Sequence, residues 1–261
     1  MGIVIVAVVG LVAGLILSVA SIVFNVPVDE KEEALLEVLP GANCGACGFS
    51  GCSGYAAALA KGEAKVGLCA PGGPDVAEEC AEVLGVSAGN VEKKVAVIRC
   101  GGHCDNVDSK LEYKGIDTCL AASQLFGGDS ACQYGCLGYG DCAAACPEHA
   151  ITICNGLATV DADLCTGCGI CAKTCPKQVI TVAPAKFRQH VRCINKDKGA
   201  ETRKVCKTGC IGCMKCQKEC PFGAITVKDF HASIDYDKCK NCGKCKAVCP
   251  VHAIQGFRIQ K

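Results

Sequence analysis

The sequence predicts an α+β protein with a single N-terminal transmembrane helix, a small four-cysteine domain and two further cysteine-rich domains. Three observations support this fold class. Residues 2–26 carry no charged side chain. The 261-residue chain has 27 cysteines, most of them in closely spaced runs. A short motif that begins with Cys-Pro occurs four times between residues 146 and 254.

The first segment, "GIVIVAVVGLVAGLILSVASIVFNV" at residues 2–26, predicts a membrane anchor. About 20 apolar residues suffice for a helix to span a bilayer. A cleaved signal peptide would have a basic start, a shorter apolar region and a small-residue cleavage site. We therefore expect residues 1–27 to form a single-pass anchor in contact with membrane lipid. The acidic flank "VDEKEEALLE" says little about its orientation.

The cysteine content is typical of either a disulfide scaffold or a metal-rich protein. Disulfide scaffolds are usually short and secreted. Here the cysteine count is odd, and closely spaced cysteines converge on one point more easily than they pair with distant partners. The pattern favours metal binding by reduced thiolates, which persist in the cytoplasm. We therefore expect the domains after the anchor to lie on the cytoplasmic side of the cell (inner) membrane.

Charge is distributed unevenly along the chain. Residues 1–185 carry 10 Lys and Arg against 20 Asp and Glu, whereas residues 186–261 carry 17 against 6. A basic terminal domain on an otherwise acidic protein suggests an acidic partner. Nucleic acid would also satisfy the charge, and a solvated lysine-rich face is the simplest alternative.

Residues 28–90 predict a small [4Fe–4S] domain. "DEKEEALLEVLP" predicts a short helix that ends at Pro40, and "GYAAALAKG" predicts a second helix. Between and after them stand four cysteines spaced C-x2-C-x4-C-x16-C, namely Cys44, Cys47, Cys52 and Cys69. Four thiolates can hold a four-iron cluster or zinc, but structural zinc usually uses two separated C-x2-C pairs. The spacing favours iron–sulfur, and Cys80 is interpreted as a buried, inert thiol.

Residues 91–128 are predicted to be a connector. It contains Cys100, Cys104 and Cys119, which could hold a further metal. No fourth partner stands at a familiar spacing, so these three cysteines are left unassigned.

The four copies of the Cys-Pro motif are "CPEHAI", "CPKQVI", "CPFGAI" and "CPVHAI", which begin at Cys146, Cys175, Cys220 and Cys249. The first two and the last two are separated by the same interval, and a longer interval lies between the pairs. Equal spacing within each pair indicates two copies of a two-motif unit. In bacterial-type ferredoxins the run is C-x2-C-x2-C-x3-C-P, and its fourth cysteine binds the other cluster of the pair. The motifs therefore predict two dicluster ferredoxin-like units, at residues 129–184 and 185–261.

Local structure in these units follows from the motif. We expect the fourth cysteine to begin a helix, because proline costs no hydrogen bond at a helix start. The Ala-Ile or Val-Ile pair should enter a short strand. Asn155-Gly156 predicts a hairpin turn after the first such strand.

The ferredoxin pattern predicts four ligand sets. In the second unit they are Cys210, Cys213, Cys216 and Cys249, and Cys220, Cys239, Cys242 and Cys245. In the first unit one set is Cys146, Cys165, Cys168 and Cys171. The other comes from the irregular run "CQYGCLGYGDCAAACP" and comprises Cys132, Cys136, Cys142 and Cys175. Cys154, Cys193 and Cys206 are spare, and Cys206 is interpreted as a structural thiol.

With the first domain, these sets predict five [4Fe–4S] clusters on twenty cysteines. No G-x-G-x-x-G motif opens a βαβ unit, and no nucleophile–base constellation is evident. His149 and His252 occupy the same slot of their repeats, which favours duplication over ligation. We expect no catalytic site beyond redox chemistry and no nucleic-acid binding.

The order of anchor, four-cysteine module and ferredoxin repeats resembles the B subunits of the Rnf complex. The segments "GANCGACGFSGC" and "YGCLGYGDC" carry the resemblance, which covers nearly the whole chain. It is similar to the longer members, which have a second dicluster unit. The family belongs to membrane complexes that pass electrons from reduced ferredoxin to NAD⁺ and export Na⁺ or H⁺.

This resemblance implies an electron-transfer subunit of an ion-translocating ferredoxin:NAD⁺ oxidoreductase. It implies reduced ferredoxin as the electron donor and the other membrane and peripheral Rnf subunits as partners. An anchored polyferredoxin of a different membrane dehydrogenase or hydrogenase is the alternative. A zinc-bearing scaffold with a nucleic-acid-binding tail is a second rival, but the chain lacks the aromatic platforms common in such binders.

Overall fold

The computed structural model of the chain describes residues 10–15, 17–19, 29–89 and 91–256. Most of the predicted anchor at residues 2–26 lies outside the described residues, and within it residues 10–15 and 17–19 are helical. Among the helices of the described ranges, none combines the length and the apolar character that crossing a membrane requires.

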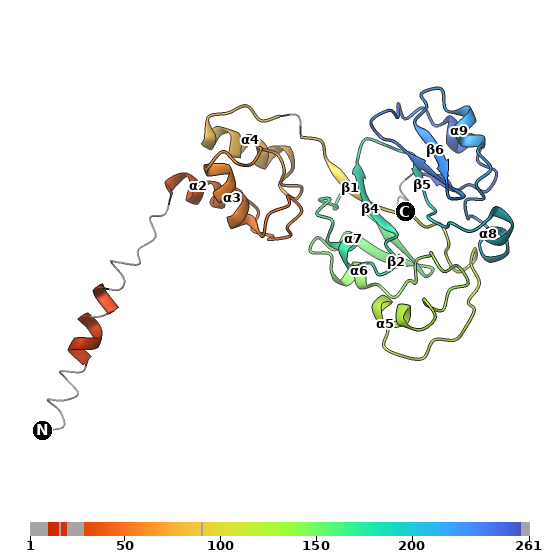
Figure 1. Ribbon diagram of the computed structural model, residues 1–261, viewed down its shortest axis with the longest axis horizontal. Coiled ribbons are helices and arrows are strands. Elements are labelled where there is room, and N and C mark those ends of the chain that lie inside the picture. Colours follow the sequence, from red (N-terminus) through yellow and green to blue (C-terminus); the bar gives the residue numbers. More distant parts are fainter. Residues whose placement is uncertain (1–9, 16, 20–28, 90, 257–261) are drawn as a thin grey trace, which may run out of the picture.

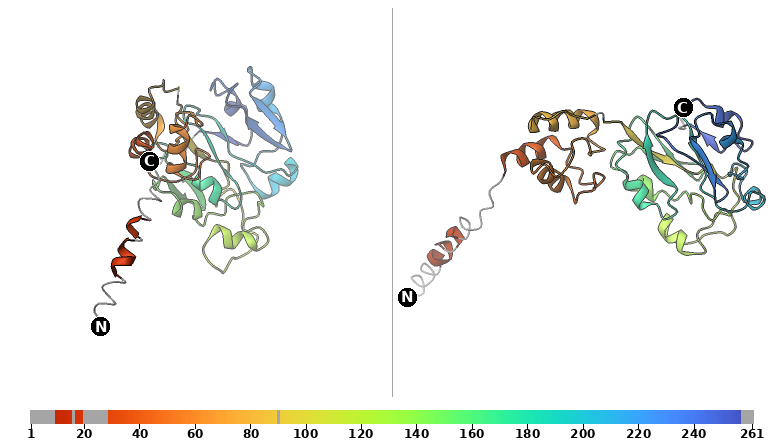
Figure 2. Two further views of the ribbon diagram at one scale, coloured as in Figure 1. Left: turned by 60° about the vertical axis from the view of Figure 1, so that its left-hand side comes forward. Right: turned by 45° about the horizontal axis from the view of Figure 1, so that its top comes forward.

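Three helices form the first lobe of the protein (Figures 1 and 2). They are α2 (Glu30–Val38), α3 (Cys52–Ala60) and α4 (Gly73–Leu84), and the first two confirm the helices expected from the sequence. Asp29 caps α2 by accepting a hydrogen bond from the Lys31 amide. Leu35, Tyr55 and Leu59 are almost fully buried where the helices meet.

The first ferredoxin-like unit contains two antiparallel strand pairs. Strand β1 (Lys94–Ile98) pairs with β4 (Ile180–Pro184), and β2 (Ile151–Cys154) pairs with β3 (Leu157–Val160). The short helices of this region are α5 (Cys119–Gln124), α6 (Asp141–Ala144) and α7 (Ile170–Thr174). Strand β1 lies within residues 91–128, so part of the expected connector belongs to the sheet of this unit.

The second unit repeats this arrangement. Strand β5 (His190–Val191) pairs with β8 (Ile254–Gln255), and β6 (Ile225–Lys228) pairs with β7 (His231–Ile234). Its helices are α8 (Gly199–Val205), α9 (Lys215–Glu219) and α10 (Lys244–Ala247). The two units therefore share one order of strands, with the outer strands β1 and β5 in equivalent places.

The predicted strand and turn positions are confirmed. The strands β2, β4, β6 and β8 begin at the isoleucines of the four Cys-Pro motifs, Ile151, Ile180, Ile225 and Ile254. The hairpin between β2 and β3 turns at Asn155 and Gly156, with φ values of 50° and 71°. Two positive φ angles are what a type I′ turn requires, and they match the twist of the flanking strands.

The expected helix after each Cys-Pro pair is wrong. The short helices α6, α7, α9 and α10 end before the fourth cysteine, and the Cys-Pro pair instead enters a turn. In the first copy the His149 amide donates to the Cys146 carbonyl at 3.2 Å, which closes the turn. Proline fits such a turn at its second position, where the φ fixed by its ring is the one needed and no N–H is used.

The last residue of this turn is left-handed in all four copies. The four positions, with φ between 49° and 59°, are His149, Gln178, Gly223 and His252. The shared backbone explains the repeated slot of the two histidines without any role as ligands.

Replacing a glycine of positive φ lowers stability more where a neighbouring backbone lies close to the added Cβ. We expect Gly138→Ala to lower the thermal unfolding midpoint of the full chain clearly, by the equivalent of about 2–4 kcal/mol. Gly138 has φ of 79°, and an added Cβ would overlap the carbonyl of Gly156. As a control, Gly223→His should change stability by about 1 kcal/mol or less, because nothing lies within 4 Å of its Cβ position. Equal midpoints for the two variants would contradict this account.

Candidate metal centres

The four cysteines of the first lobe surround one hollow. We call Cys44, Cys47, Cys52 and Cys69 set A; they line a space of about 310 Å³, part of it open to solvent. Asn43 fixes the loop by accepting a hydrogen bond from the Cys52 amide at 2.8 Å. The Tyr55 hydroxyl donates to the Lys65 carbonyl and accepts from the Leu68 amide, which holds the segment before Cys69. Helix α3 and this segment thus close the set.

In the first ferredoxin-like unit, the cysteines of one predicted set lie together. Set C comprises Cys146, Cys165, Cys168 and Cys171. Burial, together with the charges of the other three sulfurs, raises the pKa of Cys171 to about 12. Backbone amides point at two of these sulfurs: Ala96 donates to Cys165 at 3.3 Å and Ala150 to Cys146 at 3.4 Å.

The second unit holds two such sets. Set D comprises Cys210, Cys213, Cys216 and Cys249, and set E comprises Cys220, Cys239, Cys242 and Cys245. Each lines a hollow of about 350 Å³. Burial, together with the charges of the sulfurs of the same set, raises the pKa of Cys216 and of Cys245 to about 11. Amides again face sulfur: Ala253 donates to Cys249 at 3.2 Å.

The exchange expected from the motif is visible in these sets. Cys146 ends one run of cysteines and lies with the next run, and Cys220 does the same in the second unit. Cys249 ends the last run and lies with the run before it. The turn after each Cys-Pro pair directs the chain from one set into the strand beside the other. In each unit, each of the two runs thus supplies its last cysteine to the set of the other run.

The irregular run gives a different grouping from the expected one. Burial is the largest cause that raises the pKa of Cys142 to about 12, and the charges of Cys119 and Cys175 are the next largest. Burial likewise is the main cause that raises the pKa of Cys136 to about 11, and the charges of the nearby sulfurs of Cys142 and Cys119 contribute. We call Cys119, Cys136, Cys142 and Cys175 set B.

Cys119 reaches set B through a contact between two helices. The Asp141 carboxylate at the start of α6 accepts hydrogen bonds from the amides of Cys119 and Leu120 at 2.8 and 2.9 Å. This fixes the start of α5 beside Cys142. Cys119 stands well before the irregular run in the sequence, so no motif spacing pointed to it.

Cys132, the expected first ligand of that run, lies elsewhere. Its sulfur accepts a hydrogen bond from the Asn195 side chain at 3.7 Å and lines a hollow with residues of the second unit. Of the other spare cysteines, Cys80 is buried in the core of the first lobe, as expected. Cys104 and Cys154 are exposed.

The electrostatics of these sets fit a cationic group at their centre. Burial opposes the thiolate form of cysteines such as Cys142, Cys171 and Cys216 by raising their pKa, and thiolates that share a set repel one another. A metal centre between the sulfurs removes both penalties, since it binds deprotonated sulfur and supplies positive charge. The amide hydrogen bonds to sulfur are the contacts that tune iron–sulfur clusters. Among the described residues, no group of three or more His, Cys, Asp or Glu is placed to hold a single metal ion.

Comparisons with known protein families bear on the nature of this group. Residues 39–71 match a family described as a putative Fe-S cluster. Residues 164–224 and 209–253 match a family described as a 4Fe-4S dicluster domain. The first match spans set A, and the last spans sets D and E. The chain therefore carries iron–sulfur domains of the [4Fe–4S] type.

Whole-chain relatives are also found. The chain is 44% identical to the B subunit of the Na⁺-translocating ferredoxin:NAD⁺ oxidoreductase complex of Acetobacterium woodii, over 95% of this chain and 74% of the relative. It is 45% identical to the B subunit of the proton-translocating ferredoxin:NAD⁺ oxidoreductase complex of Clostridium ljungdahlii, over 90% and 84%. The B subunit of the ion-translocating oxidoreductase complex of Methanosarcina acetivorans is 41% identical, over 88% of each chain.

The placement of Cys119 is testable by metal content. We expect Cys119→Ala in the full chain, purified without oxygen, to lower bound iron by about four atoms, the content of one [4Fe–4S] cluster. The exposed Cys154→Ala variant is the control and should keep the iron of the parent. Iron and acid-labile sulfide per chain are the measurements. Unchanged iron in Cys119→Ala would remove this residue from set B.

Proposed function

The chain belongs to the family of B subunits of ion-translocating ferredoxin:NAD⁺ oxidoreductase complexes, and from this premise we propose that it accepts electrons from reduced ferredoxin and passes them to other subunits of such a complex. The observation that carries the proposal is the set of paired, hollow-lining cysteine groups in units of the dicluster type. Such a subunit is part of an oxidoreductase and translocase and is associated with the membrane.

Sets A to E are the proposed ligands of five [4Fe–4S] clusters. When bound, such clusters supply one-electron transfer, in which one cluster loses an electron as its neighbour gains it. The role of the chain is to fix the spacing of the sites, exclude water from the sulfurs and direct amides at them. In set B we propose Cys119 in place of Cys132, because Cys119 is the sulfur beside Cys136 and Cys142.

We propose that residues 2–26 anchor the chain as a single helix and that the cluster domains face the cytoplasm. The support is the uncharged apolar sequence of this segment and the need for reduced thiolates. The other membrane and peripheral subunits of the complex would then be reached from the anchored end.

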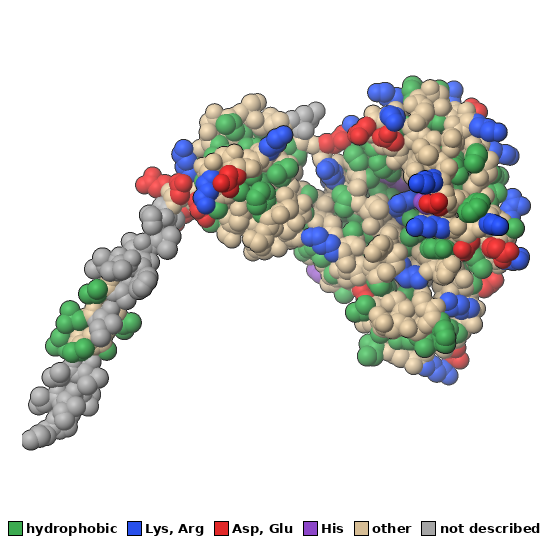
Figure 3. Space-filling model, viewed as in Figure 1, with side chains coloured by type: hydrophobic (Ala, Val, Ile, Leu, Met, Phe, Trp, Pro, Cys, Tyr) green, Lys and Arg blue, Asp and Glu red, His purple; other side chains and the backbone are tan. Residues whose placement is uncertain are grey.

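The electron entry site is proposed on the second unit. Helices α9 and α10 pack against each other, and both carry exposed lysines: Lys215, Lys218, Lys244 and Lys246. Lysine and arginine side chains are abundant over this part of the surface (Figure 3). Cys213 of set D and Cys242 of set E are exposed beside these helices. An acidic ferredoxin would be attracted by the charge and would meet two sites near the surface.

The charge of this surface predicts a rate effect. Changing Lys215, Lys218, Lys244 and Lys246 to Gln should slow reduction of the clusters by ferredoxin by about tenfold or more at low salt. The difference should shrink as salt screens the charges. Stopped-flow absorbance of the full chain measures the rate. The matched control changes four exposed lysines elsewhere, Lys31, Lys61, Lys65 and Lys114, and should leave the rate near that of the parent.

An unchanged rate at low salt in the first variant would place the ferredoxin site elsewhere. The broader proposal has its own test. Reduced ferredoxin should bleach the visible absorbance of the anaerobically purified full chain, and a chain rich in zinc and poor in iron would refute electron transfer altogether.

A further inference from the structure

A sixth group of cysteines surrounds a hollow that sets A to E do not use. Cys100, Cys132, Cys193 and Cys206, which we call set F, are each 7 or 8% exposed. Together they line a space of about 370 Å³, part of it open to solvent. The hollows of sets A, D and E measure about 310 to 350 Å³. Set F thus has the cysteine number and the hollow size of the ferredoxin-type sets D and E, and its sulfurs are more buried than Cys213 and Cys242 of those sets.

The fold brings these cysteines together from distant parts of the chain. Cys100 follows strand β1 and Cys193 follows strand β5, the equivalent outer strands of the two units. Cys206 directly follows α8, and Cys132 begins the irregular run of the first unit. No linear spacing could have shown a group scattered so widely along the sequence.

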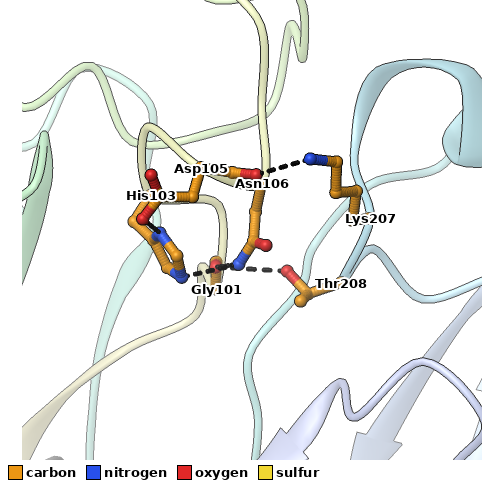
Figure 4. Close-up of polar contacts among 6 residues, drawn as sticks. All are labelled: Gly101, His103, Asp105, Asn106, Lys207 and Thr208. Atoms are coloured by element: carbon orange, nitrogen blue, oxygen red, sulfur yellow. Dashed lines mark hydrogen bonds and ion pairs between the residues drawn. The ribbon is translucent and has the colours of Figure 1, made fainter.

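Hydrogen bonds join the loops that carry Cys100 and Cys206 (Figure 4). The Thr208 hydroxyl donates to the Gly101 carbonyl at 3.1 Å, and Lys207 Nζ donates to the Asp105 carbonyl at 2.8 Å. The Lys207 amide donates to the Asn106 carbonyl at 2.9 Å. These contacts hold the walls of the hollow independently of any group inside it.

Donors directed at the sulfurs reproduce the pattern of the other sets. The Gly102 amide donates to Cys100 Sγ at 3.4 Å, and the Asn195 amide donates to Cys193 Sγ at 3.4 Å. The Asn195 side chain, only 2% exposed, also donates to Cys132 Sγ at 3.7 Å. A buried side-chain amide aimed at sulfur is a contact expected around an iron–sulfur cluster.

Glycines keep the backbone close to these sulfurs. A Cβ at Gly102 would lie 3.6 Å from Cys100 Sγ and 3.7 Å from Cys206 Sγ. A Cβ at Gly135 would lie 3.7 Å from Cys132 Sγ, and one at Gly209 would lie 3.6 Å from Cys206 Sγ. Three short segments therefore approach the hollow through residues without side chains.

From these observations we propose that Cys100, Cys132, Cys193 and Cys206 hold a sixth [4Fe–4S] cluster. The proposal rests on the proposed function, since it assumes that the other sets bind clusters. It gives a role to three cysteines that the motif spacing left spare or unassigned, and to Cys132 once Cys119 completes set B.

The position of set F is between the two ferredoxin-like units. The Cys136 amide, from set B, donates to Cys100 Sγ at 3.5 Å. The backbone of Cys210, from set D, hydrogen-bonds to the Cys193 sulfur. Each neighbouring set therefore touches set F through the backbone of one of its own cysteines. The proposed site is the direct link between the clusters of the second unit and those of the first.

Metal content of the full chain tests the proposal. The anaerobically purified parent should contain about 24 iron atoms and as many acid-labile sulfides, four for each of six sets. Cys193→Ala and Cys206→Ala should each contain about 20. Two control variants should keep the iron of the parent: Cys80→Ala, in which the replaced thiol is buried, and Cys154→Ala, in which it is exposed. Mössbauer spectra of ⁵⁷Fe-enriched parent should show four-iron clusters only.

The outcomes separate this proposal from the proposed function. Cys216→Ala in set D should lose about four iron atoms if the proposed function holds. Loss in Cys216→Ala but not in Cys193→Ala or Cys206→Ala, with about 20 iron atoms in the parent, would overturn set F alone. About 22 iron atoms with a two-iron Mössbauer signature, or one zinc per chain beside about 20 iron atoms, would also overturn it. The parent measurements decide the question even if a variant fails to fold.

Discussion

Mutual repulsion of buried thiolates is the constraint on which the rest of this structure depends. A set of four deprotonated sulfurs is stable inside a protein only with positive charge between them and donors around them. The chain meets this need with short elements, in which strands of two to five residues and helices of four to seven surround the sets in the ferredoxin-like units. Cysteines themselves form much of the buried core there. Metal binding and folding are therefore coupled in these units.

The sequence was informative where one short segment contains the whole signal. The Cys-Pro repeats located β2, β4, β6 and β8 to the residue, because Ile151 and its equivalents directly follow the turn. The Asn155-Gly156 turn was likewise predictable from two residues. The expected helix after Cys-Pro failed because proline suits a turn as well as a helix start, and spacing alone does not separate the two.

Contacts between segments that are distant in the sequence could not be predicted from motif spacing. Cys119 lies beside Cys142 where Asp141 binds the start of α5, and no periodic pattern encodes that contact. Cys132 fits the linear run better than Cys119, yet the fold turns its sulfur towards Asn195. Strand β1 was hidden for a similar reason, since its partner β4 comes at the far end of the first unit.

Two neighbouring sets differ from the rest in their access to solvent. Cys213 and Cys242 are exposed, whereas Cys100, Cys132, Cys193 and Cys206 are buried. The basic helices α9 and α10 accompany the exposed sulfurs, so charge and access coincide at one end of the ferredoxin-like body. Deep burial at the junction of the units shields the remaining thiolates from solvent and from oxidants.

The pairing of β5 with β8 has a consequence for biogenesis. Cys193 is held in place by a strand whose partner, Ile254–Gln255, is among the last described residues to be synthesised. The hollow at the junction therefore cannot be complete on a nascent chain that lacks this segment, whereas the first lobe can already be. The first lobe could then bind its cofactor while the chain is still being synthesised. The hollow at the junction could bind one only after β8 has been synthesised.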